Sequence, residues 1–451
     1  MIDCYVKKSG IYIHIPFCVS KCNYCAFLSE AVGFNGDIAV NEKINRYIDA
    51  LCAEIRSRGS IFAEHHKDDD FNSEVCDTIY FGGGTPSLLE PIQVEKIISA
   101  VYDSFAFAGN PEITLEANPA TITENKLAGY KSLGITRLSI GVQSFNDKVL
   151  KRLGRIHCAR DIIDDYDLAR KIGFDNISMD LIFASPDTNL NDVKCDIKVM
   201  SDLQPEHISF YSLQIEEGTP FFEQMEADIL NEVPDCVERE MYHIGCELLE
   251  TAGYEHYEIS NFARGRSVSD SPYRSKHNSK YWNMNEYIGL GIGASSYEMC
   301  GCSSSRCDDA TQYIYSLNAM KSAWEIADYA AYPSLYRRTV NCADLKQYLE
   351  NAISGESQFE EIHLNTIRDN IEEAVFTGLR RREGIRYSDI KDLVCADKRC
   401  DPRIWFRSIY GKIWDELDDF EKSGYLEIDS DGLRLTSKGI DISNRIMMLF
   451  L

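Results

Sequence analysis

The sequence predicts an α/β fold: a parallel sheet that curves into a partial barrel, followed by a small winged-helix-like domain. Two observations predict the barrel. Short apolar, β-branched segments alternate with longer amphipathic ones, and unusual polar or glycine-rich residues follow nearly every apolar segment. A third observation predicts the second domain, because the alternation gives way after about residue 365 to helices and two short strands around an Asp-Gly turn.

Six segments are expected to be strands: 11–15, 78–82, 113–117, 137–142, 177–183 and 207–213. Stretches with helical spacing lie between most of them, such as 45–55, 94–102 and 192–203. Strands that alternate with helices pair in parallel through right-handed crossovers. We therefore expect an incomplete (β/α)6 barrel of the TIM type.

Three regions follow from this pattern. Residues 1–215 form the barrel core, 216–364 a helical or irregular extension that completes it, and 365–451 the winged-helix-like domain. The acidic insert of residues 65–74 is expected to be a solvated loop. Residues 370–451 carry 14 Lys or Arg against 16 Asp or Glu, so we expect the last domain to pack rather than to bind DNA.

Composition narrows the class of protein. A chain of 451 residues with a formal net charge of -25 is not expected to bind nucleic acid, which requires concentrated positive charge. No apolar run has the length of a membrane span, and "MIDCYVKKSG" lacks the apolar core of a secretory signal. We expect a cytoplasmic location, where the 16 cysteines would be free thiols or metal ligands.

Cys18, Cys22 and Cys25 form a C-x3-C-x2-C pattern in "IYIHIPFCVSKCNYCAF". The spacing also suits a buried helical stripe of free cysteines, but Pro16 and the short segment after a strand disfavour a helix. A zinc site would need a fourth ligand, for which His14 is the nearest candidate. An iron–sulfur cubane normally takes four thiolates, so three would leave one iron open to a ligand from outside the protein.

The other unusual residues follow the expected strands, where chemistry collects in such barrels. They lie in "GGGTP" (82–86), "EANP" (116–119), "GVQSF" (141–145) and around Asp180 in "SMDLIF". Glycines let the backbone approach a ligand closely, although a Gly run also suits an ordinary turn. A carboxylate inside an apolar strand, such as that of Asp180, must find a partner or a ligand.

Together these motifs resemble the radical SAM enzymes. The resemblance implies a [4Fe–4S] cluster on Cys18, Cys22 and Cys25, with S-adenosyl-L-methionine chelated at the open iron and cleaved by one electron. It implies further contacts to S-adenosylmethionine, which are carried over one by one onto matching positions. These positions are Tyr12, Tyr24, Gly83, Gly84, Thr85, Glu116, Gln143, Arg155 and Asp180.

Within that superfamily the chain is similar to the oxygen-independent coproporphyrinogen III oxidase-like family. The similarity rests on "YIHIPFC", "YFGGGTPSLL", "RLSIGVQSF", "LKRLGRIH" and "HISFYSLQIEEGTPF". The oxidases carry a further cysteine two positions after the third, where this chain has Phe27, and a longer segment before the cluster than the 17 residues here. These departures favour the HemW-type haem chaperone branch, which implies haem as ligand and apo-haemoproteins, including membrane-associated ones, as acceptors.

The segment "HNSKYW" is similar to the HNxxYW motif of that branch and implies haem contacts from His277, Asn278, Tyr281 and Trp282. Imidazole is a good iron ligand, and the two aromatic rings offer flat apolar area to a porphyrin. An amphipathic turn with a hydrogen-bonded histidine explains the segment equally well. Other histidines could also ligate haem: His157, His207, His243 and His256.

The sequence thus favours haem chaperoning over catalytic turnover. One alternative is an oxygen-independent coproporphyrinogen III dehydrogenase, which oxidatively decarboxylates propionate side chains in porphyrin biosynthesis. Another is a zinc protein with no redox role. Cys300, Cys302 and Cys307 in "CGCSSSRC" suit either a second metal site or, as we prefer, an irregular loop of free thiols. The oligomeric state does not follow from the sequence.

Overall fold

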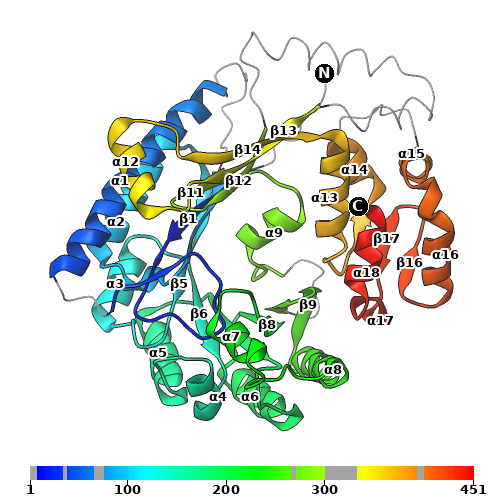
Figure 1. Cartoon of the computed structure of the whole chain (residues 1–451), viewed down its shortest axis with the longest axis horizontal. Helices are drawn as coiled ribbons and strands as arrows, with labels where there is room; N and C mark the ends of the chain where they lie inside the picture. Colours follow the sequence, from blue (N-terminus) through cyan, green and yellow to red (C-terminus); the bar gives the residue numbers. More distant parts are fainter. Residues whose placement is uncertain (1–7, 34–37, 66–75, 266–270, 300–332, 394–400) are drawn as a thin grey trace.

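The computed structural model describes residues 8–33, 38–65, 76–265, 271–299, 333–393 and 401–451 (Figure 1). The acidic insert, from residue 66 onward, lies outside the described residues. So do Cys300, Cys302 and Cys307. Among the described helices, none has both the length and the apolar character required to cross a bilayer.

The six expected strands form a continuous parallel sheet, in the order of the chain. They are β1 (Ser9–Ile15), β4 (Cys76–Gly83), β5 (Phe107–Ala117), β6 (Arg137–Gln143), β7 (Ile177–Phe183) and β8 (His207–Ser212). The expected partial barrel of parallel strands is therefore confirmed.

Helices cover the outer face of this sheet, as the amphipathic stretches predict (Figure 1). They are α1 (Ile38–His65), α2 (Pro91–Ser104), α3 (Glu124–Ser132), α4 (Asp147–Arg152), α5 (Ala159–Ile172) and α6 (Leu190–Leu203). Side-chain oxygens of Thr123, Asn146 and Asn189 cap three of them by accepting from backbone N–H groups in the first turn. The outward-facing Ile, Leu and Phe residues of the strands pack beneath these helices and form the main core.

Alternation along the strands places the remaining side chains inside the barrel. On β1 and β4 the inward set is Gly10, Tyr12 and His14 beside Thr78, Tyr80 and Gly82, as the register requires. Glu112 and Glu116 on β5, Arg137 on β6 and Asp180 on β7 continue the set. The interior is thus polar and aromatic, unlike the apolar filling of a closed small barrel.

The extension is richer in strands than we expected. Two strands continue the sheet beyond β8 and four continue it beyond β1, giving twelve strands in the order β14-β13-β12-β11-β1-β4-β5-β6-β7-β8-β10-β9. The added strands are β9 (Tyr254–Glu258), β10 (Asn261–Arg264), β11 (Tyr287–Leu290), β12 (Ser295–Met299), β13 (Pro333–Asn341) and β14 (Phe359–Thr366). The described part of this region contains the helices α7 (Pro220–Glu226), α8 (Asp235–Thr251), α9 (Lys276–Trp282) and α12 (Leu345–Ser354).

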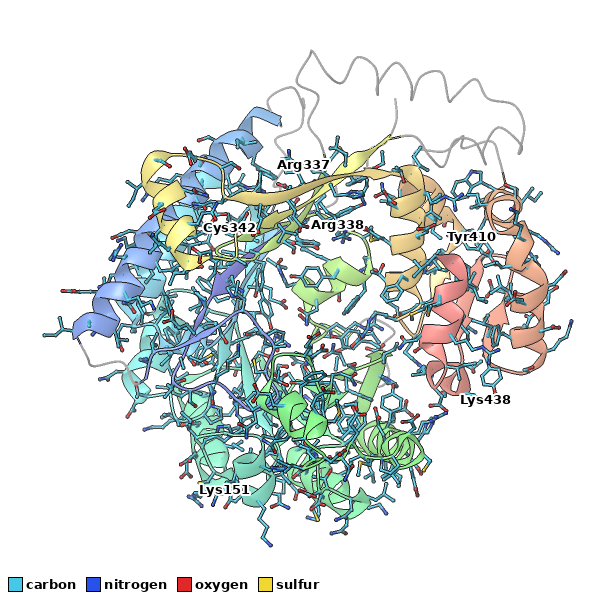
Figure 2. The ribbon with its side chains drawn as sticks, viewed as in Figure 1. Lys151, Arg337, Arg338, Cys342, Tyr410 and Lys438 are labelled. Carbon is cyan, nitrogen blue, oxygen red and sulfur yellow. The ribbon has the colours of Figure 1, made fainter. Side chains whose placement is uncertain are left out.

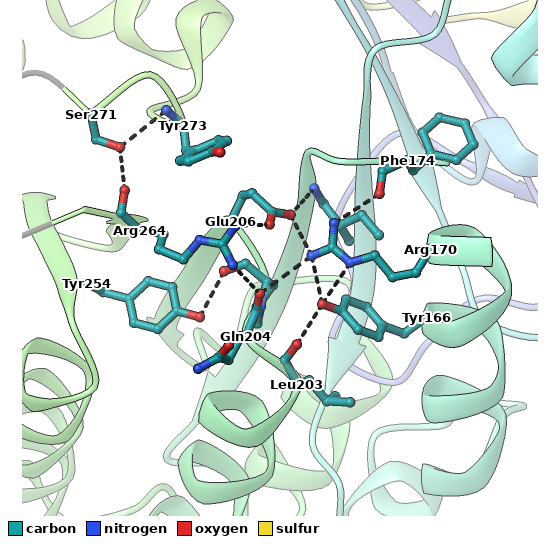
Figure 3. A network of polar contacts seen from close by, with 12 residues as sticks. Tyr166, Arg170, Phe174, Leu203, Gln204, Glu206, Tyr254, Arg264, Ser271 and Tyr273 are labelled. Carbon is teal, nitrogen blue, oxygen red and sulfur yellow. Dashed lines mark hydrogen bonds and ion pairs between the residues drawn. The ribbon is translucent and has the colours of Figure 1, made fainter. Parts of the chain in front are cut away.

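The buried carboxylate of Glu206 connects several elements beside β8. Glu206 pairs with Arg170 of α5 and with Arg264 of β10, both at 2.6 Å, and accepts the backbone N–H of Ile177 at 3.1 Å (Figure 3). Because two guanidinium groups and a backbone donor share one carboxylate, the antiparallel strand β10 is joined to the parallel core.

The last domain has the expected winged-helix outline, and its core is continuous with Tyr287, Tyr297 and Tyr336 of the large sheet. Helices α13 (Ile367–Gly378), α14 (Tyr387–Leu393), α15 (Pro402–Ile409) and α16 (Trp414–Lys422) precede the wing strands β16 (Leu426–Ile428) and β17 (Gly432–Leu435). The short strand β15 (Ile385–Arg386) pairs with β17, and α17 (Ser437–Ile440) and α18 (Ser443–Met447) end the chain.

Arg338 joins the sheet to this domain. From β13 it donates to both carboxylate oxygens of Glu373 on α13, at 2.6 and 2.7 Å, and to the hydroxyl of Tyr287 at 2.9 Å. Figure 2 shows Arg338 on the side of the sheet from which α13 extends. The bidentate pair fixes both distance and orientation between β13 and α13.

Candidate functional site

The three motif cysteines lie on one ordered loop. Cys18 ends the short strand β2 (Phe17–Cys18), which pairs with β3 (Glu30–Ala31), while Cys22 and Cys25 lie between these strands, outside any helix. The N–H of Asn23 donates to the carbonyl of Leu153 at 3.0 Å, and its own carbonyl accepts from Phe221 at 2.9 Å. The loop is therefore held against the ends of α4 and α7 rather than standing free.

Two of the sulfur atoms accept hydrogen bonds from neighbouring motifs. The hydroxyl of Thr85 donates to Cys18 Sγ and the guanidinium of Arg155 to Cys22 Sγ, both at 3.5 Å. Burial raises the pKa of the Cys18 and Cys25 thiols. Donors aimed at sulfur favour the thiolate form that metal ligation requires, so this donor set fits an iron–sulfur centre.

His14 does not complete a zinc site in this structure. Its Nε2 donates to the carbonyl of Leu28 at 2.8 Å, which leaves Nδ1 to accept from the hydroxyl of Tyr12 at 3.1 Å. Within the described residues, no group of three or more His, Cys, Asp or Glu side chains is placed to hold a metal ion. A cubane differs from such a site because each thiolate binds its own iron, which allows the sulfurs to stand farther apart than the ligands of one ion.

The glycine run packs against β1 and the cysteine loop. Gly83 has φ +109°, and a Cβ there would lie 2.6 Å from the His14 ring. A Cβ on Gly84 would lie 2.7 Å from the carbonyl oxygen of Phe17. The N–H of Thr85 donates to that same oxygen at 2.8 Å. These glycines are thus required by protein packing, and their contacts with a ligand stay a prediction.

Glu116 lies at the end of β5 and joins two elements of the site. Its carboxylate accepts from the hydroxyl of Tyr80 at 2.7 Å and from the N–H of Gly83 at 3.1 Å. Desolvation by burial raises the pKa of Glu116 to about 7, although the hydrogen bond from Tyr80 lowers it. A carboxyl with a pKa near neutrality is typical of functional sites.

Gln143 ends β6, Arg155 follows α4 and Asp180 lies on β7. Besides burial, the charge of Asp180 raises the pKa of Glu116. Gln143 is buried with φ +70°, a left-handed conformation that is costly for this residue, and it accepts from Tyr211 at 3.3 Å. Arg155 also donates to the carbonyl of Gly141 at 2.7 Å. Burial raises the pKa of Asp180, and its bond with Ser209 and the charges of Arg137 and Arg155 oppose that rise.

The two motif tyrosines have different surroundings. The ring of Tyr12 stacks on Tyr80, with centroids 6.2 Å apart, inside the barrel. Tyr24 packs against the small apolar cluster that contains Leu153 and Phe221. Burial raises the pKa of both hydroxyl groups, so both stay neutral.

Helix α9 carries "HNSKYW" into the barrel, where it lies between the strands and the last domain (Figure 1). Glu112 accepts from the N–H groups of Lys276 and His277, at 3.0 and 3.3 Å, and so caps the first turn. The His277 ring stacks on Tyr80 with centroids 5.1 Å apart. Its Nδ1 hydrogen-bonds with Thr78 at 2.8 Å and its Nε2 with Tyr281 at 2.9 Å.

The structure does not bring the four residues of this motif to one face. His277 is 1% exposed and faces the barrel, where burial lowers its pKa to about 3. Trp282 lies on the other side of α9, beside the last domain, and Arg380 of that domain lies 4.6 Å from the indole ring. Asn278 is partly buried between them and donates its N–H to Ser275.

The other histidines have partners of their own. His157 contacts Asn118 and the carbonyl of Val142, and His207 lies between Ser178 and Tyr257. The ring of His256 stacks on Phe262, whereas the half-exposed His243 pairs with Asp441. Of these four, only His243 lies outside the buried interior.

Sequence reasoning missed Tyr80, Glu112 and Arg137. Tyr80 connects Glu116 to His277, Glu112 caps α9, and Arg137 is a fully buried guanidinium whose charge acts on Glu112 and Glu116. The period of two along β4, β5 and β6 places these side chains with the motif residues, and that signal could have found them.

The chain is similar to known proteins along its whole length. The model of the radical SAM superfamily matches residues 12–198, and that of the HemN C-terminal domain matches residues 366–442. A heme chaperone HemW of Bacillus subtilis is 30% identical over 441 residues, which cover 98% of each chain. A heme chaperone HemW of Synechocystis is 36% identical over 293 residues, covering 65% of this chain and 67% of the relative.

Among solved structures, coproporphyrinogen III oxidase (HemN) from Escherichia coli has a similar fold. It is 21% identical, with a TM-score of 0.73, and the match covers 98% of this chain and 90% of that one. At that identity the likeness concerns the fold alone. The partial barrel and the C-terminal domain are thus both features of a known architecture.

Proposed function

This chain belongs to the HemW branch of the HemN-like radical SAM proteins, and on that premise we propose that it binds haem and passes it to apo-haemoproteins. The observation that carries the proposal is the extent of the similarity to HemW of Bacillus subtilis, which includes the region of α9 and the last domain. Similarity confined to the barrel would have supported only a radical SAM core.

We propose that Cys18, Cys22 and Cys25 hold a [4Fe–4S] cluster beside an S-adenosylmethionine site. When bound, these groups supply one-electron chemistry. The protein contributes fixed positions: Thr85 and Arg155 donate to the sulfurs of Cys18 and Cys22. The cysteine loop is tied to its neighbours through Asn23, so the thiols are positioned before any metal arrives.

The proposed contacts to S-adenosylmethionine come from the strand ends. Carboxylates of Glu116 and Asp180 offer acceptors for hydroxyl and ammonium groups, and Gln143 offers an amide. The buried guanidinium of Arg155 offers a positive charge to the carboxylate of S-adenosylmethionine. The backbone of Gly83 and Gly84 with Thr85 forms one wall, while Tyr12 and Tyr24 exclude water from it.

We propose that haem docks on α9, with contacts from His277, Asn278, Tyr281 and Trp282. Because His277 and Trp282 lie on different sides of α9 in this structure, these contacts require the side chains to rearrange when haem binds. In this structure the Tyr281 hydroxyl is hydrogen-bonded to Nε2 of His277. Iron can bind that nitrogen only if the hydroxyl moves away. The rings of Tyr281 and Trp282, with centroids 6.4 Å apart, offer flat apolar area to a porphyrin.

Phe27 supports the chaperone over the dehydrogenase. Its side chain is 69% exposed two residues after Cys25, at the position where the oxidases carry a further cysteine. A phenylalanine ring has no metal-ligating atom, so this position cannot supply the further thiol that the oxidases carry there. The acceptor is proposed to be an apo-haemoprotein.

The test is anaerobic reconstitution followed by haem titration and transfer. We expect a Soret band that saturates near one haem per chain, and loss of that band when an apo-haemoprotein such as apomyoglobin is added. Absence of any haem spectrum at stoichiometric haem would reject the chaperone function.

The coproporphyrinogen III dehydrogenase is kept as the second candidate because of the fold shared with HemN. Reconstituted protein incubated anaerobically with coproporphyrinogen III, S-adenosylmethionine and a reductant decides between the two. We expect no protoporphyrinogen, and its formation would favour the dehydrogenase.

A further inference from the structure

A cavity of about 300 Å³ lies between α9 and the last domain. One wall is the side of α9 that faces away from His277, with Ser279, Trp282 and Asn283. The opposite wall belongs to the segment from Arg381 to Asp389, and Tyr257 and Arg274 close the remainder. The cavity is therefore shared by the barrel and the C-terminal domain.

Two buried donors at this cavity have no acceptor among the described residues. They are the indole Nε1–H of Trp282 and the Nε–H of Arg381. A buried donor without an acceptor is destabilising, so an acceptor oxygen placed beside these two donors would be favourable. The two donors would both be satisfied by a ligand with acceptor oxygens.

Arg381 forms no ion pair with the described residues. Its guanidinium donates to Asn283 Oδ1 and to the carbonyl of Gly384, both uncharged. Burial lowers its pKa, and the charges of Asp389 and Glu383, which also line the cavity, offset only part of that fall. The neighbouring Arg274, by contrast, is paired with Glu255 and Glu383.

The lining as a whole carries an excess of positive charge. Three arginines, Arg274, Arg381 and Arg386, face two carboxylates, Glu383 and Asp389. A guanidinium fork with free N–H groups is the arrangement that recognises carboxylates. The volume is at the lower limit of small-molecule pockets, enough for a short acidic side chain but not for a whole macrocycle.

We propose that this cavity is a carboxylate subsite that receives a propionate side chain of the tetrapyrrole bound at α9. The proposal rests on the proposed haem binding and deepens it, because it gives the C-terminal domain a role in recognising the ligand. Arg381 supplies the charge and Trp282 the second donor, so the ligand contacts both domains at once.

The experiment compares iron protoporphyrin IX with its dimethyl ester, which keeps the macrocycle but lacks the negative charges. Both are titrated into the reconstituted full chain and into Arg381→Gln and Arg386→Gln. The matched control is Arg368→Gln, an exposed arginine on α13 that does not line the cavity. Circular dichroism verifies that each variant is folded.

We expect wild type and Arg368→Gln to bind haem at least tenfold more tightly than the ester, as a charge-assisted hydrogen bond predicts. Arg381→Gln should reduce that preference below threefold while binding the ester normally. If Arg381→Gln fails to fold, Arg386→Gln decides, since its exposed side chain lines the same cavity and should reduce the preference at least threefold.

Equal binding of haem and ester by wild type would overturn the subsite and leave haem binding intact. Full preference in both cavity variants would also overturn it. Binding of neither compound by wild type would reject the proposed function and the subsite together. Sodium propionate alone tests for a site for free carboxylates, and a rise in Tm with propionate but no haem-over-ester preference would overturn the assignment to a tetrapyrrole.

Discussion

The imidazole of His277 stacks on the ring of Tyr80, whose hydroxyl donates to the carboxylate of Glu116 at 2.7 Å. The ring of Tyr12 lies beside both, with its centroid 6.2 Å from that of Tyr80 and 6.4 Å from that of His277. The helix proposed to hold haem and the strand ends proposed to hold S-adenosylmethionine are therefore in direct contact. A ligand that moves α9 would change the surroundings of Glu116.

The first prediction concerns the cluster. Cys18→Ala should lower iron and sulfide well below the four of each per chain expected of a [4Fe–4S] protein, because one of the three thiolates is lost. The control is Cys195→Ala, which replaces an exposed cysteine on α6 and should leave the iron and sulfide contents unchanged. Iron, zinc and sulfide analysis of anaerobically reconstituted protein provides the measurement. Stoichiometric zinc without sulfide in the wild type would contradict the cluster.

The second prediction concerns pH. The pKa of Glu116 is raised from 4.5 to about 7 in the folded protein, so folding is favoured below pH 4.5 and this contribution is lost as the pH rises to about 7. The stability of Glu116→Gln relative to wild type should therefore increase between pH 5 and pH 8. Urea unfolding at several pH values measures it.

The control for that experiment is Glu350→Gln on α12, whose exposed side chain should leave the pH profile unchanged. A stability difference between Glu116→Gln and wild type that stays flat across this range would contradict the raised pKa.

The third prediction tests the histidine of α9. His277→Ala should weaken haem binding at least tenfold if the imidazole ligates iron, because that bond has no replacement. Tyr281→Phe should strengthen binding, since it removes the hydroxyl that competes for Nε2. The exposed His363→Ala is the control. Spectrophotometric titration of the Soret band gives each affinity, and unchanged affinity in His277→Ala would remove this residue from the haem site.

The fourth prediction separates packing from backbone strain. Gly83→Ala and Gly173→Ala both place a side chain at positive φ, +109° and +100°, which costs about 1 to 2 kcal/mol. Only at Gly83 does the new Cβ meet an obstacle, the His14 ring at 2.6 Å. Gly83→Ala should therefore be the more destabilising by at least about 1 kcal/mol in chemical denaturation. Equal losses would show that the ring moves aside freely.

The fifth prediction concerns the junction between the sheet and the last domain. Arg338→Ala should lower the free energy of unfolding by about 1 to 3 kcal/mol, because it removes a bidentate pair and leaves Glu373 partly buried. Arg368→Ala breaks an exposed pair with Glu372 and should cost less than about 0.5 kcal/mol. A double-mutant cycle with Glu373→Ala measures the coupling, and a coupling near zero would contradict a direct role for the pair.

The sequence by itself determined the parallel barrel, the winged-helix outline and the family. Local periodicity decides which segments are strands. The family motifs C-x3-C-x2-C and "GGGTP" consist of residues that are close in the sequence, so they can be recognised without the fold. The sequence also determined that the cysteine segment is not helical, because Pro16 and the preceding strand are visible in the sequence.

Only the tertiary structure decided the contacts between distant residues. Strands β11 to β14 extend the sheet next to β1, and α9 enters the barrel to stack His277 on Tyr80, 197 positions earlier in the sequence. The cavity beside Trp282 and the partner of each histidine nitrogen depend in the same way on two elements meeting. Hydrogen bonds and packing between elements are set by side-chain positions in three dimensions, whereas periodicity reports only which face of one element is buried.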